Sequence, residues 1–305
     1  MDPDQRVYAY GPYGSSPVAQ EARPANLRVR LLSAVNSMPP LPAALSRLMR
    51  MLNSDAISAT QVAAVIEGDS VLSGSVMKCV NSAYYGMPRR VSSIRHAVTL
   101  LGFQTVRNLA LAFSMRRMMT GSAASRKLYG SYARHALATA LLAQNAAVRV
   151  SGGDIESAFA AGLFHDVGKL LIYTAAPEAV PSILKRMEES GCSYLEAERE
   201  TLETTHAELS AIVLEGWKLP DMICVAARYH HEPQLAAAPA DGAPSLTALV
   251  HAADMAVNFE GFRTPDGLPN PPQDPAATLA SLQLGGIDLL ESFRAEFENL
   301  QEMFG

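Results

Sequence analysis

The sequence lacks the features of exported, disulfide-stabilised and membrane-spanning proteins. Its three cysteines, Cys79, Cys192 and Cys224, are odd in number and widely spaced, so they predict neither a disulfide framework nor a zinc ribbon. No apolar run reaches the roughly 20 residues that a membrane helix needs. The N-terminus carries Asp2 and Asp4 and has no apolar segment of the kind found in export signals. We therefore expect a cytoplasmic protein that does not associate with a membrane.

Acidic residues are missing from a long stretch of the first half. None lies between Asp69 and Asp154, a span that holds eleven basic residues. Residues 1–130 contain 15 Lys and Arg against 6 Asp and Glu, whereas residues 131–305 contain 10 against 24. The two halves can therefore attract each other, or the basic span can bind an anionic partner. We favour the first interpretation, because Ala and Leu run through the span and predict that much of it is core.

Helical periodicity is the main feature that the sequence does have. With 49% hydrophobic and 18% charged residues, the chain can bury a sizeable core. Apolar residues recur three and four positions apart, and no stretch alternates apolar and polar residues long enough to suggest a strand. Predicted capping boxes, which begin helices, are Ser58 with Gln61, Ser193 with Glu196, and Thr205 with Glu208. Predicted helix ends lie at Gly68, Gly102, Gly152 and Gly191. The sequence therefore predicts an all-α fold.

Changes in composition predict how the chain is divided. Residues 119–125 are small and polar, and they separate two blocks of helical pattern. A proline-rich segment follows residue 263 and precedes a final amphipathic helix around 287–303. The expected parts are a flexible leader (1–25), a first helical lobe (26–122), a second helical lobe (123–262), and a linker with a C-terminal helix (263–305).

Histidines and carboxylates gather in the second half. Six of the seven histidines lie between residues 135 and 251, and His165 is followed directly by Asp166 in GLFHDVGK. Imidazole nitrogen and carboxylate oxygen together suit first-row divalent metals. Such a metal lowers the pKa of bound water and supplies hydroxide near neutral pH, which suits phosphoester hydrolysis. Lys169, almost one turn beyond His165, could approach a metal-bound phosphate or form an ion pair with Asp166.

These residues resemble the ligand pattern of a known superfamily. His135, the His165–Asp166 pair and Asp254 resemble the ligands of HD-superfamily metal-dependent phosphohydrolases. His206 and the pair His230–His231 fall where HD-GYP cyclic-dinucleotide phosphodiesterases have extra ligands. The resemblance thus implies one or two divalent ions (Fe, Mn, Ni or Zn). However, HHEPQLAAAP lacks the Gly-Tyr-Pro of HD-GYP enzymes, which argues against cyclic-dinucleotide hydrolysis.

The first half resembles the HDOD family more specifically. The resemblance begins at Pro39, and its most distinctive pieces are NSAYYG at 81–86, VSSI at 91–94 and LG at 101–102. Joined to the FHDVGK segment, it covers about 220 residues. It implies an all-helical output or scaffold domain of bacterial signalling, in a family without demonstrated hydrolase activity.

Three functional hypotheses follow from these observations. The first is a non-catalytic signalling module that binds a signalling protein or a small phosphorylated ligand. The second is a metal-dependent phosphohydrolase acting on a nucleotide or similar phosphoester, with Lys169 as its catalytic cation. The third is a regulator that binds nucleic acid through the basic span. We favour the first, and the histidines and carboxylates could then form a polar network that locks helices together instead of a metal site.

The segment after residue 83 offers a second candidate site. Tyr84 and Tyr85 could form an exposed binding platform, but we expect Gly86 to cap a helix, with the tyrosines packed on the core. The role of Tyr85 stays open. Arg89 and Arg90 are expected to be solvated, although they could also bind the phosphates of RNA or of a nucleotide second messenger.

Overall fold

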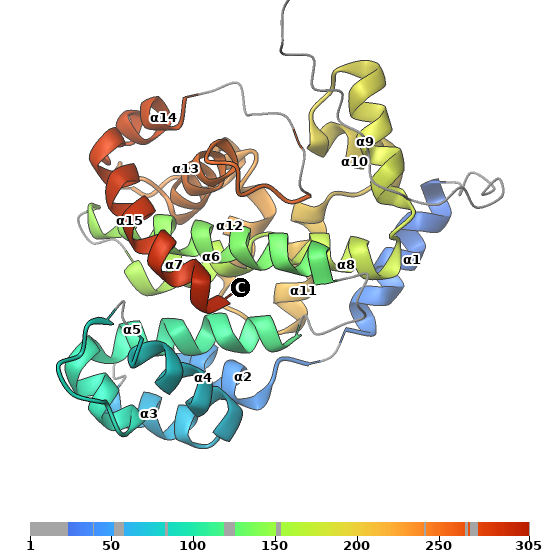
Figure 1. Cartoon of the computed structure of the whole chain (residues 1–305). Coiled ribbons are helices and arrows are strands. Elements are labelled where there is room, and N and C mark those ends of the chain that lie inside the picture. Colours follow the sequence, from blue (N-terminus) through green and yellow to red (C-terminus); the bar gives the residue numbers. More distant parts are fainter. Residues whose placement is uncertain are drawn as a thin grey trace, which may run out of the picture.

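A computed structural model shows that every regular element in the described part of the chain is a helix (Figure 1). The structure describes residues 24–38, 40–51, 58–82, 85–118, 126–150, 154–240, 242–265, 268 and 274–304. The predicted all-α fold is confirmed. Residues 1–23 of the predicted leader, Tyr84 and the predicted boundary segment 119–125 lie outside the described residues. None of the described helices combines the length and the apolar character needed to cross a bilayer.

Helices of the first lobe pack around one long helix. They are α2 (Ala43–Met51), α3 (Ala59–Glu67), α4 (Ser70–Val80) and α5 (Ile94–Met118). The first three all pack against α5 (Figure 1). In α2 the buried residues Leu45, Leu48 and Met49 form the expected apolar stripe, because positions three and four apart share a helix face.

The second lobe is a larger bundle. Its helices are α6 (Arg126–Val148), α7 (Ile155–Phe164), α8 (Val167–Ala175), α9 (Ala179–Ser190), α10 (Tyr194–Leu202), α11 (His206–Gly216), α12 (Asp221–Tyr229), the 3₁₀ turn η2 (Pro233–Leu235), α13 (Leu246–Phe259), α14 (Pro275–Ser281) and α15 (Gly286–Phe304). Helices α6, α7, α12 and α13 pack together, while α9 and α10 form a pair at one side (Figure 1). The C-terminal helix α15 packs against α6 and buries Phe293 and Phe297.

Helix boundaries follow the local sequence signals closely at the starts and less closely at the ends. All three predicted capping boxes are present, at Ser58, Ser193 and Thr205. Gly191 ends α9 in the left-handed conformation, and Gly68 follows α3 in a right-handed one. The predicted helix end at Gly102 is confirmed. With φ of +81° and ψ of 155° this residue is not helical, and it separates two helical segments of α5 across a kink. The predicted end at Gly152 lies outside the described residues.

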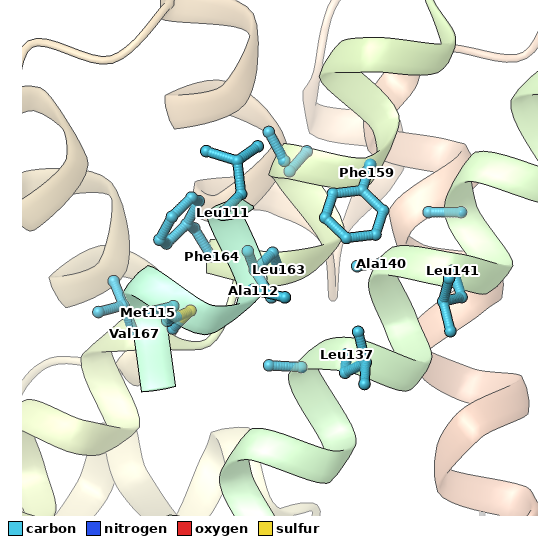
Figure 2. Close-up of a cluster of buried hydrophobic side chains, with 14 of the residues drawn as sticks. Leu111, Ala112, Met115, Leu137, Ala140, Leu141, Phe159, Leu163, Phe164 and Val167 are labelled. Atoms are coloured by element: carbon cyan, nitrogen blue, oxygen red, sulfur yellow. The ribbon is translucent and has the colours of Figure 1, made fainter. Parts of the chain in front are cut away.

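The two lobes meet along α5 and α7 (Figure 2). Leu111 and Met115 of α5 lie in the same buried cluster as Phe164 and Val167 of the second lobe. Next to this cluster, the fully buried Arg107 of α5 forms an ion pair with Glu156 of α7. The contact between the lobes therefore combines apolar burial with an ion pair whose arginine is buried and whose glutamate is partly exposed.

Helix α1 (Pro24–Asn36) precedes the first lobe in the sequence but packs against the second lobe. The prediction grouped most of it with the first lobe, as part of residues 26–122, but α1 contacts α8, α10 and α11 of the second lobe. Leu27 and Leu31 provide the buried face of this helix. The described part of the chain thus starts against the second lobe at α1 and then crosses to the first lobe.

Candidate metal centre

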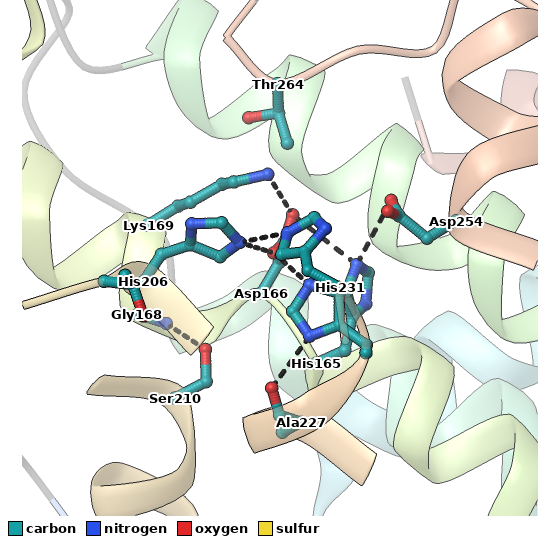
Figure 3. Close-up of polar contacts among 12 residues, drawn as sticks. His165, Asp166, Gly168, Lys169, His206, Ser210, Ala227, His231, Asp254 and Thr264 are labelled. Atoms are coloured by element: carbon teal, nitrogen blue, oxygen red, sulfur yellow. Dashed lines mark hydrogen bonds and ion pairs between the residues drawn. The ribbon is translucent and has the colours of Figure 1, made fainter. Parts of the chain in front are cut away.

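Seven polar side chains from five segments converge inside the second lobe (Figure 3). They are the seven residues of the sequence prediction: His135, His165, Asp166, His206, His230, His231 and Asp254. His135 lies in the middle of α6, and Asp254 lies in α13. His206 is the first residue of α11, and the two adjacent histidines follow α12. The packing of α6, α7, α12 and α13 brings these distant positions together.

His165 and Asp166 sit in a break between two helices. On one continuous helix, these adjacent side chains would point about 100° apart. His165 is the C-cap of α7 and Asp166 is the N-cap of α8, with φ −103° and ψ 10°. The Asp166 side chain makes no capping hydrogen bond. The turn therefore directs these two adjacent side chains into one centre. A continuous helix would point them apart.

Two glycines allow the surrounding helices to approach closely. A Cβ on Gly162 would lie 2.7 Å from the Cα of Ala140, so only glycine fits where α7 crosses α6. A Cβ on Gly168 would lie 2.1 Å from the backbone oxygen of His206, where α8 meets α11. The amide of Gly168 also donates to Ser210 Oγ at 2.8 Å. The HDVGK segment thus positions His206 as well as its own ligands.

The first set of donors surrounds His135. Its Nε2 lies 3.3 Å from His165 Nε2, 3.3 Å from Asp166 Oδ2 and 3.2 Å from Asp254 Oδ1. His165 Nε2 lies 3.5 Å from Asp166 Oδ2 and 3.6 Å from Asp254 Oδ1. Ligands about 2.1 Å from one ion lie about 3.0–3.4 Å from each other in octahedral or tetrahedral geometry. The spacing of the donors of His135, His165 and Asp254 fits one first-row ion, and Asp166 Oδ2 lies beside them.

The second set shares Asp166 through its other oxygen. Asp166 Oδ1 lies 3.2 Å from His206 Nε2 and 3.6 Å from His230 Nε2. His206 Nε2 also lies 2.8 Å from His231 Nε2. Although they are fully buried, Asp166 Oδ1 and His230 Nε2 have no hydrogen-bond partner with acceptable geometry in the described part of the chain. Orphaned polar atoms that face each other fit a cation held between them, and a bridging Asp166 would allow two ions.

Each buried histidine is oriented through its other nitrogen. The Nδ1 atoms of His135, His165 and His230 lie 2.7, 2.8 and 2.7 Å from backbone carbonyl oxygens, those of Phe262, Gly162 and Ala227. Because a carbonyl only accepts, each Nδ1 must carry the hydrogen and donate it. In the neutral ring this leaves the lone pair on Nε2, which faces the centre.

Outer residues that the sequence analysis did not identify hold the remaining ligands. Glu198 of α10 lies 2.6 Å from His206 Nδ1 and also accepts from the His206 amide at 2.8 Å. Asn258 donates to Asp254 Oδ1 at 2.7 Å. Asn258 could have been found, since it is four residues after Asp254 on one helix face. No local sequence signal identifies Glu198 as a partner of His206.

Charge in the centre is balanced between carboxylates and cations. Burial would raise the pKa of Asp166, but the charges of Lys169, His165 and His206 outweigh burial and hold the pKa well below its usual range. Burial would lower the pKa of His135, yet hydrogen bonds to Asp166 and Asp254 raise this pKa to about 9. The pKa of Asp254 is also held well below its usual range, so both carboxylates stay ionised at neutral pH, as metal ligation requires. A metal that binds His135 displaces the proton from its ring.

The pKa values of the other histidines are shifted in both directions. Burial would lower the pKa of His206, but the charge of Glu198 opposes it and the pKa rises to about 9. Burial and the neighbouring His206 lower the pKa of His231 to about 3. For His230, burial and His231 hold the pKa well below its usual range. His230 and His231 are therefore neutral imidazoles at pH 7, the form that binds metals.

Lys169 takes part in the centre as an ion-pair partner. Its Nζ lies 2.6 Å from Asp166 Oδ2, and the side chain is 6% exposed. Of the two roles considered for this lysine, the ion pair with Asp166 is present, and a role at a phosphate stays a prediction. The ammonium also lies 5.8 Å from the centre of the Tyr194 ring.

The second candidate site lies in the other lobe, beyond α4. Arg89 and Arg90 are exposed as expected, and Tyr85 is partly buried against the core. Gly86 has the expected left-handed φ of +52°, but α4 already ends at Val80 with Asn81 as its C-cap. None of these residues contributes to the metal centre.

Comparison with known proteins identifies the family. The HDOD domain model matches residues 38–233, well over half of the chain. The chain belongs to the HDOD family. A curated relative, an uncharacterised protein of Treponema pallidum (strain Nichols), is 25% identical over 248 residues. The match covers 80% of this chain and 47% of that protein, so the chain spans about half the length of this relative.

Solved structures show the same fold. An HDOD domain protein of unknown function from Geobacter sulfurreducens has a TM-score of 0.70 at 23% identity, covering 91% of this chain and 96% of that one. A proposed phosphohydrolase from Shewanella amazonensis SB2B has a TM-score of 0.66 at 24% identity, covering 90% and 97%. At this level of identity the likeness establishes the HDOD fold alone.

Proposed function

We propose that this chain is a non-catalytic regulatory HDOD module. Its His/Asp centre holds one or two divalent transition-metal ions (Fe, Mn, Ni or Zn) as an internal brace of the second lobe. The observation that carries this proposal is the burial of six of the seven ligands: Asp166 is 0% and Asp254 3% exposed, whereas His231 is partly exposed. A catalytic metal site keeps a coordination position open to water or substrate, whereas a structural site is closed.

The residues around the centre suit a bracing role. Asp166 faces both donor sets and connects α8 to α6 and α11, so a cation on its oxygens would tie these helices together. Lys169 covers one of these oxygens and offsets its charge. A bound metal would supply Lewis acidity and an acidified water molecule. The residues themselves orient ligands and exclude solvent.

Phosphoester hydrolysis is the second candidate function. The observation in its favour is the pair of donor sets that share Asp166, since two adjacent metal ions serve many phosphoesterases. The structural neighbour from Shewanella amazonensis is described as a proposed phosphohydrolase. Against hydrolysis, Lys169 pairs with Asp166 instead of facing open space, and no Gly-Tyr-Pro follows the paired histidines.

A regulatory role has its own structural support. Val167, directly after Asp166, lies in the buried cluster where the two lobes meet (Figure 2). A change in the metal centre would therefore reach the contact between the lobes through one residue. The partners we propose are a signalling protein or a small phosphorylated ligand whose binding depends on this packing.

Metal analysis and a hydrolase screen test the proposal together. Purified wild type should contain close to stoichiometric transition metal, and Asp166→Ala should lose it. The control Glu188→Ala removes an exposed carboxylate of α9 and should keep the metal. Cyclic dinucleotides, cyclic mononucleotides and nucleotides supplied with Mn, Fe, Ni or Mg should be hydrolysed more slowly than about 1 s⁻¹. Faster turnover that Asp166→Ala abolishes would establish the hydrolase instead, and wild type without metal would refute the brace.

A further inference from the structure

Asn81 joins the end of α4 to the chain at Val91. Its Nδ2 donates to the carbonyls of Met77 at 2.9 Å and Val91 at 3.0 Å, and the Val91 amide donates to Asn81 Oδ1 at 2.7 Å. These bonds join the two ends of the loop. Gly86 provides a left-handed turn within it. Part of the NSAYYG motif therefore has a structural role, which fixes the wall of a neighbouring hollow.

Two adjacent hollows flank α4. The larger, about 1160 Å³, lies between α4 and residues 86–92. The smaller, about 310 Å³, lies between α4 and the C-terminal end of α5. Lys78 and Ser82 line both, so the hollows adjoin each other. Their combined size suits a ligand as large as a nucleotide.

The lining of these hollows is strongly cationic. Arg90 lines the larger hollow, Arg116 and Arg117 line the smaller, and Lys78 lines both. None of the described lining residues is acidic. Arg117 is paired with Asp69 at 2.7 Å, whereas Lys78 and Arg90 have no ion pair within the described chain. The hollows thus gather positive charge from the acid-free span.

An unsatisfied hydroxyl lies at the junction of the two hollows. Ser82 Oγ is buried and has no hydrogen-bond partner among the described residues. A buried hydroxyl without a partner is unfavourable, so a ligand oxygen at this position would be stabilised. Met77 and Met87 add apolar surface to the larger hollow. Cations, a hydroxyl and flexible apolar side chains are the groups that contact the phosphates and the base of a nucleotide.

We propose that these hollows bind a nucleotide carrying two or more phosphate groups. Lys78, Arg90 and Ser82 contact the phosphates, and the methionines contact the base. A single-stranded nucleic acid needs exposed aromatic side chains on which successive bases stack. The aromatic residue among the described lining residues is Phe113, which is buried. A small ligand therefore fits better than a polymer, and this site is independent of the metal centre.

Fluorescence anisotropy with N-methylanthraniloyl ATP and GTP tests this site on the full-length protein at about 50 mM salt. The double variant Lys78→Gln/Arg90→Gln should weaken binding of at least one probe about tenfold or more. The control Arg95→Gln/Lys185→Gln also removes two charges, both outside the hollows, and should change the Kd less than about twofold. Ser82→Ala should weaken binding without removing charge. Circular dichroism of each variant confirms the fold.

Three outcomes would overturn the proposal. One is no binding of either probe up to about 1 mM, since that limit corresponds to only about 4 kcal/mol of binding free energy. Another is an equal loss of affinity in the control variant, which would show general charge attraction. The third is tight, salt-sensitive binding of single-stranded RNA together with no binding of either nucleotide. This result would make the surface a nucleic-acid site. Competition by unlabelled tripolyphosphate would support phosphate recognition.

Discussion

Replacing Gly168 by alanine should damage both the stability and the metal centre. The added Cβ would lie 2.1 Å from the carbonyl oxygen of His206, 2.9 Å from its carbonyl carbon and 2.8 Å from the amide nitrogen of Ser210. All three are backbone atoms of α11, so no side-chain rotation relieves the contact. Since ordinary contacts of a Cβ begin at 3.4 Å, α8 and α11 must separate by more than 1 Å.

The magnitude follows from the two interactions that this separation disturbs. Overpacking a well-packed core costs about 1–3 kcal/mol. Loss of the bond from the Gly168 amide to Ser210 Oγ adds about 1 kcal/mol. We therefore expect Gly168→Ala to lower the free energy of unfolding by about 2–4 kcal/mol. Metal ligands tolerate displacements of only about 0.2 Å, so moving His206 should also weaken metal affinity by about tenfold or more.

Urea unfolding followed by Trp217 fluorescence measures the first effect, because the single tryptophan lies at the end of α11. Metal content after dialysis measures the second. Gly216→Ala is the matched control, since a Cβ added to this exposed glycine of α11 would meet no atom within 4 Å. It should be neutral or stabilise by up to about 1 kcal/mol. Wild-type stability and metal content in Gly168→Ala would refute the close contact of α8 with α11.

Further predictions concern the lobe contact, a helix cap and the ligand support. Glu156→Gln should destabilise the protein by about 3–5 kcal/mol by leaving the buried Arg107 charge uncompensated, and adding Arg107→Met should recover much of this loss in a denaturant titration. Asp69→Ala should cost about 1 kcal/mol at pH 7 by removing the cap of α4. The hydrogen bond from the Leu72 amide holds the pKa of Asp69 below its usual 3.8. The difference in stability between the variant and wild type should therefore shrink below about pH 4, where the carboxylate becomes protonated. Thermal melts measure this difference, and a value that stays constant with pH would contradict this account. Glu198→Ala should lower metal affinity about 10–100-fold in a chelator competition, whereas loss of affinity below twofold would show that Glu198 does not orient its histidine.

Local signals were sufficient to predict the helices. The capping boxes at Ser58, Ser193 and Thr205 depend on residues three positions apart, so the sequence alone contains both partners. At Gly102 the local signal located the end of a helical segment, but it did not show that a second segment follows directly across a kink. That arrangement depends on the packing of α5 against α2, α3, α4 and α7.

Long-range contacts were less predictable. The seven convergent residues could be proposed because histidine next to Asp166 suggested a metal, and a family pattern supplied the remaining positions. Glu198 could not be proposed, because its contact with His206 depends on how α10 folds back beside α11. In the same way, nothing near Leu27 indicates that α1 packs against the second lobe.

The geometry favours a metal site over a polar network that only locks helices together. A closed network supplies each buried donor and acceptor with a partner, because an unsatisfied buried group is costly. In this centre Asp166 Oδ1 and His230 Nε2 lie 3.6 Å apart without hydrogen-bond partners in the described residues. Burial and His231 hold the pKa of His230 low, so the ring is neutral. Its Nε2 therefore carries no hydrogen that could be donated to Asp166 Oδ1. Two acceptors that face each other attract a shared cation, and the carbonyl that fixes the His230 ring keeps its lone pair directed at that position.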